Sequence, residues 1–539
     1  MSGQYLQFEG QIYNVDEIRG LLKGTEYVKE CPLEELLYGA YKVYGPGMVK
    51  YLRGEFAFSI LDRRKETIYL FRDRLGVQTL YYAIVNGMLV YSSNLGKILA
   101  YPGVKATLDR EGACELFGMG PARTPGKTPF KGIYELLPGS YLMYNERGCQ
   151  TITYWKLETK RHTELEEDTV EESRELLRQG LKEALPKEDV AVLLSGGLDS
   201  SYLAQLYREE KGRVHTYSLD FPESQKYFNA NSFQPGLDRP YVDIMVGHLG
   251  AEHTYVWCDV KDQVAGLIPA MRSHNLPCMA DIQTTFDFFC QEVGKNYEYV
   301  LTGECADEIF GGYPWFHKEE YLHYQGFPWC YSLEPRLKFL RKDVREKLSL
   351  EEYCKEAYET ACKKITYLEE ENEEERILRK NSYLTIYYFM QTLIRRTDIA
   401  SKQAAVKAIV PFANPKLVEY AYNIPWKFKK KDGVRKYILR KAASTSIPES
   451  IYNRPKSPYP KDYNPAYKQM LIQLWEKELE KECPVFQFLD KEAWKNFIRS
   501  KEDFETPWFG QLMKGNQMMA YMLQVNQWIK DYNVTVDLK

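Results

Sequence analysis

The sequence predicts an α/β protein in which a β-rich N-terminal part precedes a doubly wound parallel sheet with a helical C-terminal part. Three observations support this fold class. Short strand-like runs dominate up to about residue 157, strand and helix patterns alternate from residue 189 to 301, and apolar residues recur at helical spacing beyond residue 353. A chain of 539 residues is too long for one ordinary core, so we expect two or three packed units.

The N-terminal part is expected to be antiparallel. Its strand-like runs are separated by charged or Gly-containing turns and lie at 56–61, 67–72, 80–84 and 88–92. We place this part at residues 1–157. The polar stretch 158–168 has no apolar period and is predicted to be a linker, before a helical pattern begins at Val170.

The second part, expected at 169–539, alternates strand and helix, which is typical of a parallel sheet covered on both faces. Strands are predicted at 190–194, 214–221, 253–258 and 297–301, and helices at 200–210, 241–249 and 284–293. The apolar run 383–394 is broken by Thr and Gln and predicts a buried helix. The acidic run 369–375 predicts a solvated helix surface.

Composition narrows the functional classes. A net charge of -3, with 44% hydrophobic and 27% charged residues, is typical of a globular protein and gives no reason to expect a nucleic acid partner. Eleven cysteines without a C-x-x-C pair argue against a zinc or thioredoxin-like site and favour a reducing cytoplasm, with cysteines mainly buried. No apolar run is long enough to cross a bilayer, so no membrane partner is expected.

The strongest chemical signal follows the apolar run 190–194, where a Gly pair, three Ser and one Asp open a helix: Ser195, Gly196, Gly197, Asp199, Ser200 and Ser201. The glycines let the backbone approach a ligand, and the hydroxyls with the free N–H groups of the helix can hold phosphate oxygens. Asp199 can place a Mg²⁺ against the same oxygens. A purely conformational Gly-Ser turn is the alternative, but three hydroxyls plus a carboxylate favour a phosphate site.

This S-G-G-L-D-S-S run resembles the pyrophosphate-binding loop of the asparagine synthetase family (B type, glutamine-hydrolysing). The run L-T-G-E-C-A-D-E-I-F-G-G-Y at 301–313 resembles the second signature of that family, and K-S-P-Y-P-K at 456–461 resembles its lysine-bearing segment. The likeness covers nearly the whole chain. It implies an N-terminal nucleophile (glutaminase-like) domain at 1–157 and an ATP-pyrophosphatase domain, similar to adenine nucleotide α-hydrolases, at 169–539.

The resemblance implies that a substrate carboxylate is adenylated by ATP with Mg²⁺ and then amidated by ammonia. Asp199 and Asp307 would share the Mg²⁺, Lys456 would offset charge on the phosphoryl group, and Glu304 would be the base. Acids at a helix N-terminus and a surface lysine are the purely structural alternatives, and the role of Glu308 stays open. By the same resemblance, further residues line the nucleotide site: Leu194, Leu219, Thr302 and Gly303.

The start of the chain departs from the family. Full-length relatives begin Met-Cys-Gly, with the cysteine as nucleophile, whereas this chain begins Met-Ser-Gly, and F-E-G-Q-I-Y-N at 8–14 resembles an internal F-N-G-E-I-Y-N segment. We therefore expect a truncated glutaminase-like domain without a nucleophile, in which Ser2 does not replace the cysteine. A truncated gene model is the alternative for the missing start. Three residues expected to hold glutamine are also exchanged, to Glu9, Gln11 and Pro32, and R-D-R-L-G at 72–76 is expected to remain as scaffold.

Two stretches of the second half also differ, D-I-A-S at 398–401 and K-A-I-V-P-F-A-N at 407–414, where relatives carry a basic residue at 399 and E-x-R-x-P-F-x-D. We expect the acceptor end of the site to be altered. The leading hypothesis is an ATP-dependent asparagine synthetase that amidates aspartate with ammonia, free or from a partner glutaminase chain. Amidation or lactam closure on another small carboxylic acid and a non-enzymatic regulatory paralogue remain alternatives. A homodimer is implied by the resemblance alone.

Overall fold

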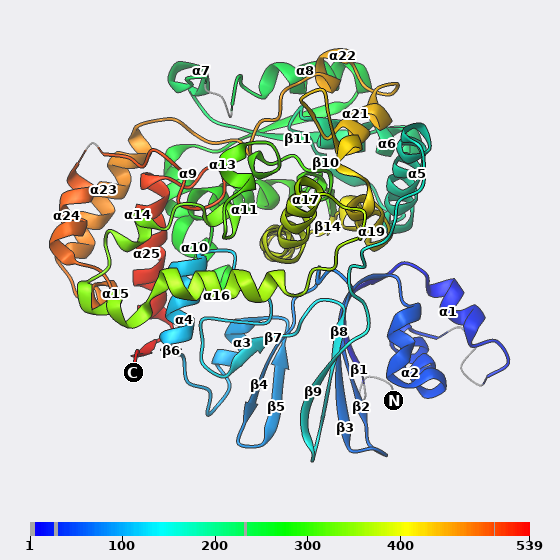
Figure 1. The fold of residues 1–539 in the computed structure, drawn as a ribbon, viewed down its shortest axis with the longest axis horizontal. Coiled ribbons are helices and arrows are strands. Elements are labelled where there is room, and N and C mark those ends of the chain that lie inside the picture. The colour runs from blue at the N-terminus through cyan, green and yellow to red at the C-terminus, as the bar shows by residue number, and fades with distance from the viewer. Residues whose placement is uncertain (1–5, 26–30, 231–233, 501) are drawn as a thin grey trace.

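The computed structural model describes residues 6–25, 31–230, 234–500 and 502–539. Its strands form two main groups, as Figure 1 shows. One group consists of antiparallel sheets near the N-terminus, and the other is a parallel sheet formed by later strands. The N-terminal part runs from β1 to β9 and the C-terminal part from α5 to β17. The predicted α/β class, with antiparallel strands first and a parallel sheet second, is confirmed in these regions.

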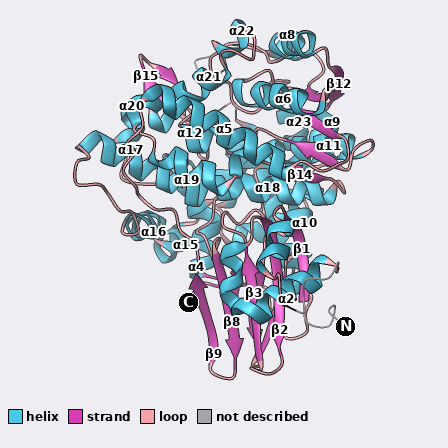
Figure 2. Ribbon diagram, turned by 90° about the vertical axis from the view of Figure 1, so that its right-hand side faces the viewer, coloured by secondary structure: helices cyan, strands magenta, loops and turns pink. Residues whose placement is uncertain are grey.

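The N-terminal part contains a five-stranded antiparallel sheet, visible at one end of the molecule in Figure 2. Its order is β1 (Leu6–Ile12), β2 (Gly54–Asp62), β3 (Thr67–Arg72), β8 (Ser140–Asn145) and β9 (Gly148–Thr153). A second sheet contains β5 (Met88–Ser92), β4 (Tyr81–Val85) and β7 (Ile133–Glu135). Side chains of β2 alternate between two cores, with Phe56 facing the core shared with α2 (Leu33–Tyr44) and Ala57 the core that includes Leu80 and Leu136.

The C-terminal part is built on a five-stranded parallel sheet in the order β12 (Glu252–Trp257), β11 (His215–Asp220), β10 (Val190–Leu193), β13 (Tyr299–Leu301) and β14 (Lys407–Ile409). Val190 and Val192 pack in a core with helices α5 (Glu166–Ala184) and α6 (Leu198–Lys211). Ala191 and Leu193 pack in a separate core with α11 (Ala280–Gly294). Helices therefore cover both faces, as a doubly wound sheet requires.

The two parts are joined at several places. Strand β17 (Thr535–Asp537), near the C-terminus, pairs in parallel with β6 (Thr107–Asp109) of the N-terminal part. Gln391, on α18 (Met390–Gln403), donates a hydrogen bond to the backbone oxygen of Leu75. The R-D-R-L-G segment at 72–76 thus lies against the C-terminal part.

Some predicted boundaries move. Helix α5 begins at Glu166, inside the predicted linker, because three acidic residues occupy its first turn and interact favourably with the helix N-terminus. The acidic run 369–375 is only partly solvated. Asn372 caps α17 (Glu373–Leu384), and Glu371 forms a buried ion pair with Arg379. Six of the eleven cysteines are buried and Cys149 is exposed. Among the described residues, no helix is long and apolar enough to span a membrane.

Candidate active site

The sheet order places a cleft at a predictable position. Strand β10 pairs with β11 on one side and with β13 on the other. From β10 the chain adds β11 and β12 on one side and then returns to add β13 on the opposite side, so the order of the strands reverses between β10 and β13. Loops that leave the carboxyl ends of strands diverge at such a switch point and form a ligand crevice. The loop 194–197 follows β10 and the loop 302–305 follows β13. A cavity of about 640 Å³ opens there, and both loops line it.

Gly196 is required by the shape of the first loop. Its φ of +66° lies in the left-handed region, and a Cβ at this position would lie 2.7 Å from the backbone nitrogen of Val242. Ser195 and Ser200 face each other, with their hydroxyl oxygens 3.0 Å apart, and the Ser195 N–H donates to Ser200 Oγ. The hydroxyls thus stand at the N-terminus of α6, where the dipole and free N–H groups favour an anion.

Arg454 holds this loop from outside. Its Nη1 donates to the backbone oxygen of Ser195 at 2.9 Å, its Nη2 forms an ion pair with Asp238, and its guanidinium lies 4.1 Å from the centre of the Tyr241 ring. The sequence analysis did not find Arg454, although it lies two residues before Lys456. The loop conformation therefore depends on a segment more than 250 residues away.

Asp199 and Asp307 are linked by two lysines. Lys436 is 3% exposed, and its Nζ lies 2.6 Å from Asp199 Oδ2 and also contacts Asp307. Lys456 Nζ lies 3.0 Å from Asp307 Oδ2. Burial alone would raise the pKa of Asp307, but the two lysines outweigh it and lower that pKa to about 2. Burial raises the pKa of Asp199, and Lys436 opposes this shift.

Lys436 was not among the sequence candidates. It lies in a stretch with four other lysines or arginines at 427–431 and another at 435, and nothing in the local pattern separates it from them. Only the packing of α21 (Tyr437–Ala443) against α5 brings its side chain to the loop after β10.

The donor set fits Mg²⁺. Asp199 Oδ1 is buried and has no hydrogen-bond partner among the described residues, so it can accept a metal bond. No group of three or more His, Cys, Asp or Glu side chains in the described ranges could hold a metal ion by itself. Two carboxylates next to a phosphate-binding loop are what Mg²⁺ needs when the remaining ligands are phosphate oxygens and water.

Glu304 is held in the cavity wall by Arg396. The Arg396 Nη2 donates to Glu304 Oε1 at 2.7 Å, while the guanidinium lies 4.7 Å from the centre of the Phe286 ring. Glu308 also lines the cavity, but it is buried and accepts a hydrogen bond from the Tyr313 hydroxyl. Burial, then the charge of Asp307, raises the pKa of Glu308 to about 8. The two residues differ in their partners, since the Glu304 carboxylate is held by a guanidinium and the Glu308 carboxyl by a phenol.

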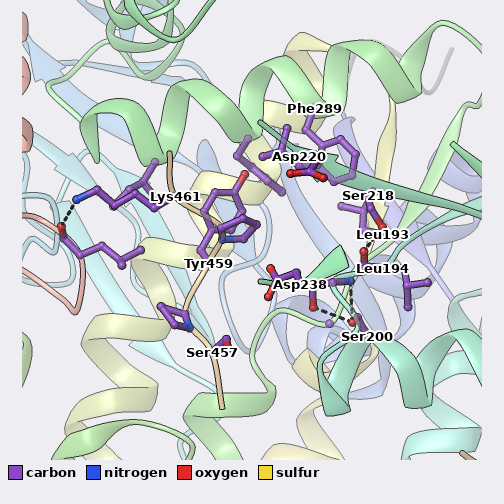
Figure 3. Close-up of a pocket in the computed structure, with 18 of the residues that line it drawn as sticks. Leu193, Leu194, Ser200, Ser218, Asp220, Asp238, Phe289, Ser457, Tyr459 and Lys461 are labelled. Atoms are coloured by element: carbon purple, nitrogen blue, oxygen red, sulfur yellow. Dashed lines mark hydrogen bonds between the residues drawn. The ribbon is translucent and has the colours of Figure 1, made fainter. Parts of the chain in front are cut away.

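The far end of the cavity carries another cation. Lys461 lines the cavity and donates to Gln517 Oε1 at 3.2 Å, and it makes no ion pair with any residue in the described ranges. Burial lowers its pKa, and the charge of Asp281 partly opposes this. Figure 3 shows Lys461 on the opposite side of the view from Ser200 and Leu194, with Tyr459 between them.

The structure brings most sequence-predicted site residues together on the wall of the main cavity: Leu194, Ser195, Asp199, Ser200, Leu219, Thr302, Gly303, Glu304, Asp307 and Lys456. Gly197 lines a small adjoining cavity of about 50 Å³. Gly196 is buried within the loop and lines neither cavity. Ser201 is fully buried and lines neither cavity, because the first turn of α6 directs it toward the core.

The exchanged stretches 398–401 and 407–414 do not reach the main cavity. Asp398 is buried and forms an ion pair with Lys402 at 3.0 Å, and Lys407 pairs with Glu298 on the exposed edge of the sheet. Asn414 caps α19 (Pro415–Asn423). The charge exchanges therefore affect a sheet edge, a helix cap and a contact between the N-terminal and C-terminal parts. The expectation that they alter the wall of the main cavity is wrong.

The exchanged residues of the N-terminal part have structural contacts. Glu9 accepts a hydrogen bond from Ser93 Oγ at 2.7 Å and lies 3.6 Å from Lys402 of the C-terminal part. Gln11 lies on β1, in register with Glu55 of β2. Ser2 lies outside the described residues.

Comparison with known proteins now decides the family. A family model described as asparagine synthase matches residues 172–530, which is more than half of the chain, and one described as glutamine amidotransferase domain matches residues 2–155. The chain belongs to the asparagine synthase family. It is therefore an enzyme of the ligase class that carries an amidotransferase-type N-terminal part.

Several known proteins are similar to this chain along most of their length. Asparagine synthetase (glutamine-hydrolyzing) 3 of Bacillus subtilis is 37% identical over 541 residues, which cover 98% of this chain and 88% of that protein. Asparagine synthetase (glutamine-hydrolyzing) 1 of the same organism is 25% identical, with 85% and 75% covered. Amidase chyE of Penicillium rubens is also 25% identical, with 84% and 76% covered.

Proposed function

We propose that this enzyme adenylates the side-chain carboxylate of aspartate with ATP and amidates it with ammonia, and that its N-terminal part hydrolyses no glutamine. The observation that carries the proposal is the arrangement of the cavity at the switch point. One end has a phosphate loop and a carboxylate pair bridged by lysines, and the wall nearby holds Glu304. A volume of about 640 Å³ is ample for an acyl-adenylate.

In the first step a carboxylate oxygen of the acceptor attacks the α-phosphorus of ATP. The bond to the bridging oxygen of pyrophosphate breaks, and pyrophosphate leaves toward Ser195 and Ser200, where α6 begins. Mg²⁺ held by Asp199 and Asp307 would neutralise charge on the departing pyrophosphate. Lys456 adds a fixed positive charge beside it, so charge that develops in the transition state meets a preorganised partner.

In the second step ammonia attacks the acyl carbon, AMP leaves, and the nitrogen loses a proton. Glu304 is the carboxylate placed to take that proton, because Arg396 binds Oε1 and leaves Oε2 for the incoming nitrogen. Tight closure of this wall around the intermediate would protect it from water.

Lys461 supports a dicarboxylic acceptor. It is a half-buried lysine at the end of the cavity away from the phosphate loop and makes no ion pair with a carboxylate among the described residues. A second carboxylate on the acceptor would supply that partner, and aspartate carries one. Aspartate is thus favoured over a monocarboxylic acid.

The nitrogen donor follows from the N-terminal part. Glu9 is engaged by Ser93 and Lys402, and burial raises the pKa of the Cys114 and Cys149 thiols of this part, which disfavours the thiolate. We therefore expect free ammonia, or ammonia from a partner glutaminase chain, to be the donor. The unpaired state of all eleven cysteines agrees with a reducing cytoplasm.

The test is pyrophosphate release from ATP and Mg²⁺ with aspartate, supplied with either ammonium or glutamine. We expect asparagine with ammonium only. Glu304→Gln and Lys456→Met should each reduce turnover at least 100-fold. Glu308→Gln should retain activity, because glutamine can still accept the hydrogen bond from the Tyr313 hydroxyl. If none of a panel of amino and dicarboxylic acids supports pyrophosphate release, the proposed reaction is refuted. Turnover with glutamine as the sole nitrogen source would refute the proposed nitrogen source.

A further inference from the structure

A second, much smaller cavity of about 20 Å³ lies behind Arg396, where the two parts of the chain meet. Arg123, from the loop after the π-helical turn Glu115–Met119, enters it from the N-terminal part. His274, at the end of α10 (Leu267–His274), and Arg395 and Arg396 of α18 enter it from the C-terminal part. Three guanidinium groups and one imidazole thus converge on a space of about one small atom, which Gln283 also lines.

The nitrogen atoms of this cavity lack acceptors. The Nε atoms of Arg123, Arg395 and Arg396 and the Nε2 of His274 are all buried without a hydrogen-bond partner among the described residues. Arg123 is 8% exposed, and its guanidinium makes no ion pair or hydrogen bond within the described ranges. Buried donors without partners are costly, and in native structures they mark a ligand or an ordered solvent molecule.

The charge balance of the region is also incomplete. Arg395 pairs with Glu135 at 2.7 Å, Arg72 pairs with the same carboxylate at 2.9 Å, and Arg396 pairs with Glu304. Burial, then the three neighbouring arginines, lowers the pKa of His274 to about 3, so it is neutral. Of the three guanidinium groups that line the cavity, Arg395 and Arg396 each have a carboxylate partner and Arg123 has none in the described ranges, so one positive charge is left without an ion-pair partner.

We propose that this cavity binds one monatomic anion of the halide class, with chloride as the physiological ligand. The wall presents donors and excess positive charge, which a neutral water molecule would leave uncompensated. A space of about 20 Å³ holds a particle of roughly the size of water and excludes phosphate, sulfate and carboxylates. The anion joins Arg123 of the N-terminal part to the helix that carries Arg396, and so fixes the residue that holds Glu304.

The first test is the melting temperature of the full chain in sodium chloride, sodium bromide and sodium gluconate at equal ionic strength. A ligand that binds only the folded state raises the melting temperature with its concentration. We expect both halides to raise it relative to gluconate, which is too large for the cavity. Arg123→Met should abolish this halide response, whereas Arg147→Met, an exposed arginine of the β8–β9 turn, should keep it.

The variant also distinguishes anion binding from a plain structural role. With no halide present, Arg123→Met should be at least as stable as the parent chain, because it removes an unpaired buried charge. A loss of stability of the same size in all three salts would instead indicate packing alone and would overturn the proposal. So would equal melting temperatures of the parent chain in chloride and gluconate.

A second measurement needs no variant. Crystals of the parent chain grown or soaked in sodium bromide should give an anomalous peak between Arg123 and Arg395. Absence of the peak in well-ordered density at this position, or a peak only at surface sites, would overturn the assignment. Neither readout depends on the reaction proposed above.

Discussion

Replacement of Glu135 by Gln is a direct test of how the two parts of the chain are held together. Glu135 lies at the end of β7 in the N-terminal part and its side chain is 3% exposed. One oxygen lies 2.9 Å from Arg72 and the other 2.7 Å from Arg395 of the C-terminal part. Glutamine keeps the shape of the protonated acid but removes the charge, so the substitution isolates the electrostatic contribution.

The size of the effect follows from the pKa. Burial would raise the pKa of Glu135, but Arg395, Arg72 and Arg123 outweigh burial and lower it from 4.5 to about 2. A lowering of the Glu135 pKa by this amount corresponds to ~3 kcal/mol of stabilisation of the ionised carboxylate. Loss of one member of a buried ion pair costs a similar amount, roughly 3–5 kcal/mol. We expect the transition of the N-terminal part to fall by roughly 6–12 °C at pH 7.

The dependence of this stability difference on pH tests whether the charge of Glu135 is its source. A carboxyl whose folded pKa is depressed stabilises the fold fully above its unfolded pKa, near 4.5, and loses that contribution as the pH falls toward 2. The difference in melting temperature between the parent chain and Glu135→Gln should therefore be constant from pH 7 to about 5 and narrow below 4.5.

Differential scanning calorimetry at pH 7, 5 and 4, with the exposed Glu146→Gln as control, measures this difference. A decrease no larger than that of the control would refute the assigned role of the ion pair. A gap that stays constant below pH 4.5 would show that the charge of Glu135 is not its source.

Three other substitutions have defined outcomes. Gly196→Ala should weaken binding of a non-hydrolysable ATP analogue at least 10-fold, measured by calorimetry, because the new Cβ would lie 2.7 Å from the backbone and φ at this position is positive. Gly197→Ala should bind the analogue normally, because its Cβ would meet only a hydroxyl at 3.3 Å. Lys436→Met should reduce pyrophosphate release at least 100-fold, since Asp199 loses the cation that pairs with it, and the exposed Lys441→Met should not. Equal rates in the two variants would refute the role of Lys436 between Asp199 and Asp307. Burial raises the pKa of Asp287 to about 7, so its destabilising charge develops as the pH rises from about 4 through 7; Asp287→Asn should raise the melting temperature at pH 8 and leave it unchanged at pH 4, and the reverse order would contradict that sign.

Local sequence was sufficient for the phosphate loop. The Gly-Gly turn after an all-apolar strand fixes backbone dihedrals, and the helix that begins at Leu198 sets the direction of the Ser200 hydroxyl. The strand and helix alternation also predicted the parallel sheet, although helix α5 begins earlier than its apolar period because charged residues stabilise its first turn. Ser201 shows the limit, since two adjacent serines differ in direction only through the helical rotation between them.

The charges that complete the site were decided by tertiary structure. Three cations, Lys436, Arg396 and Arg454, reach the cavity or its loop from about 90 to 260 residues away from the groups they contact. No local period marks them among 72 lysines and arginines. The sequence by itself determined the backbone conformation of the loop after β10, because dihedral preference and helix start are short-range properties. Which cation neutralises which buried carboxylate was settled only by packing, because electrostatic pairing depends on distance in space and not on separation along the chain.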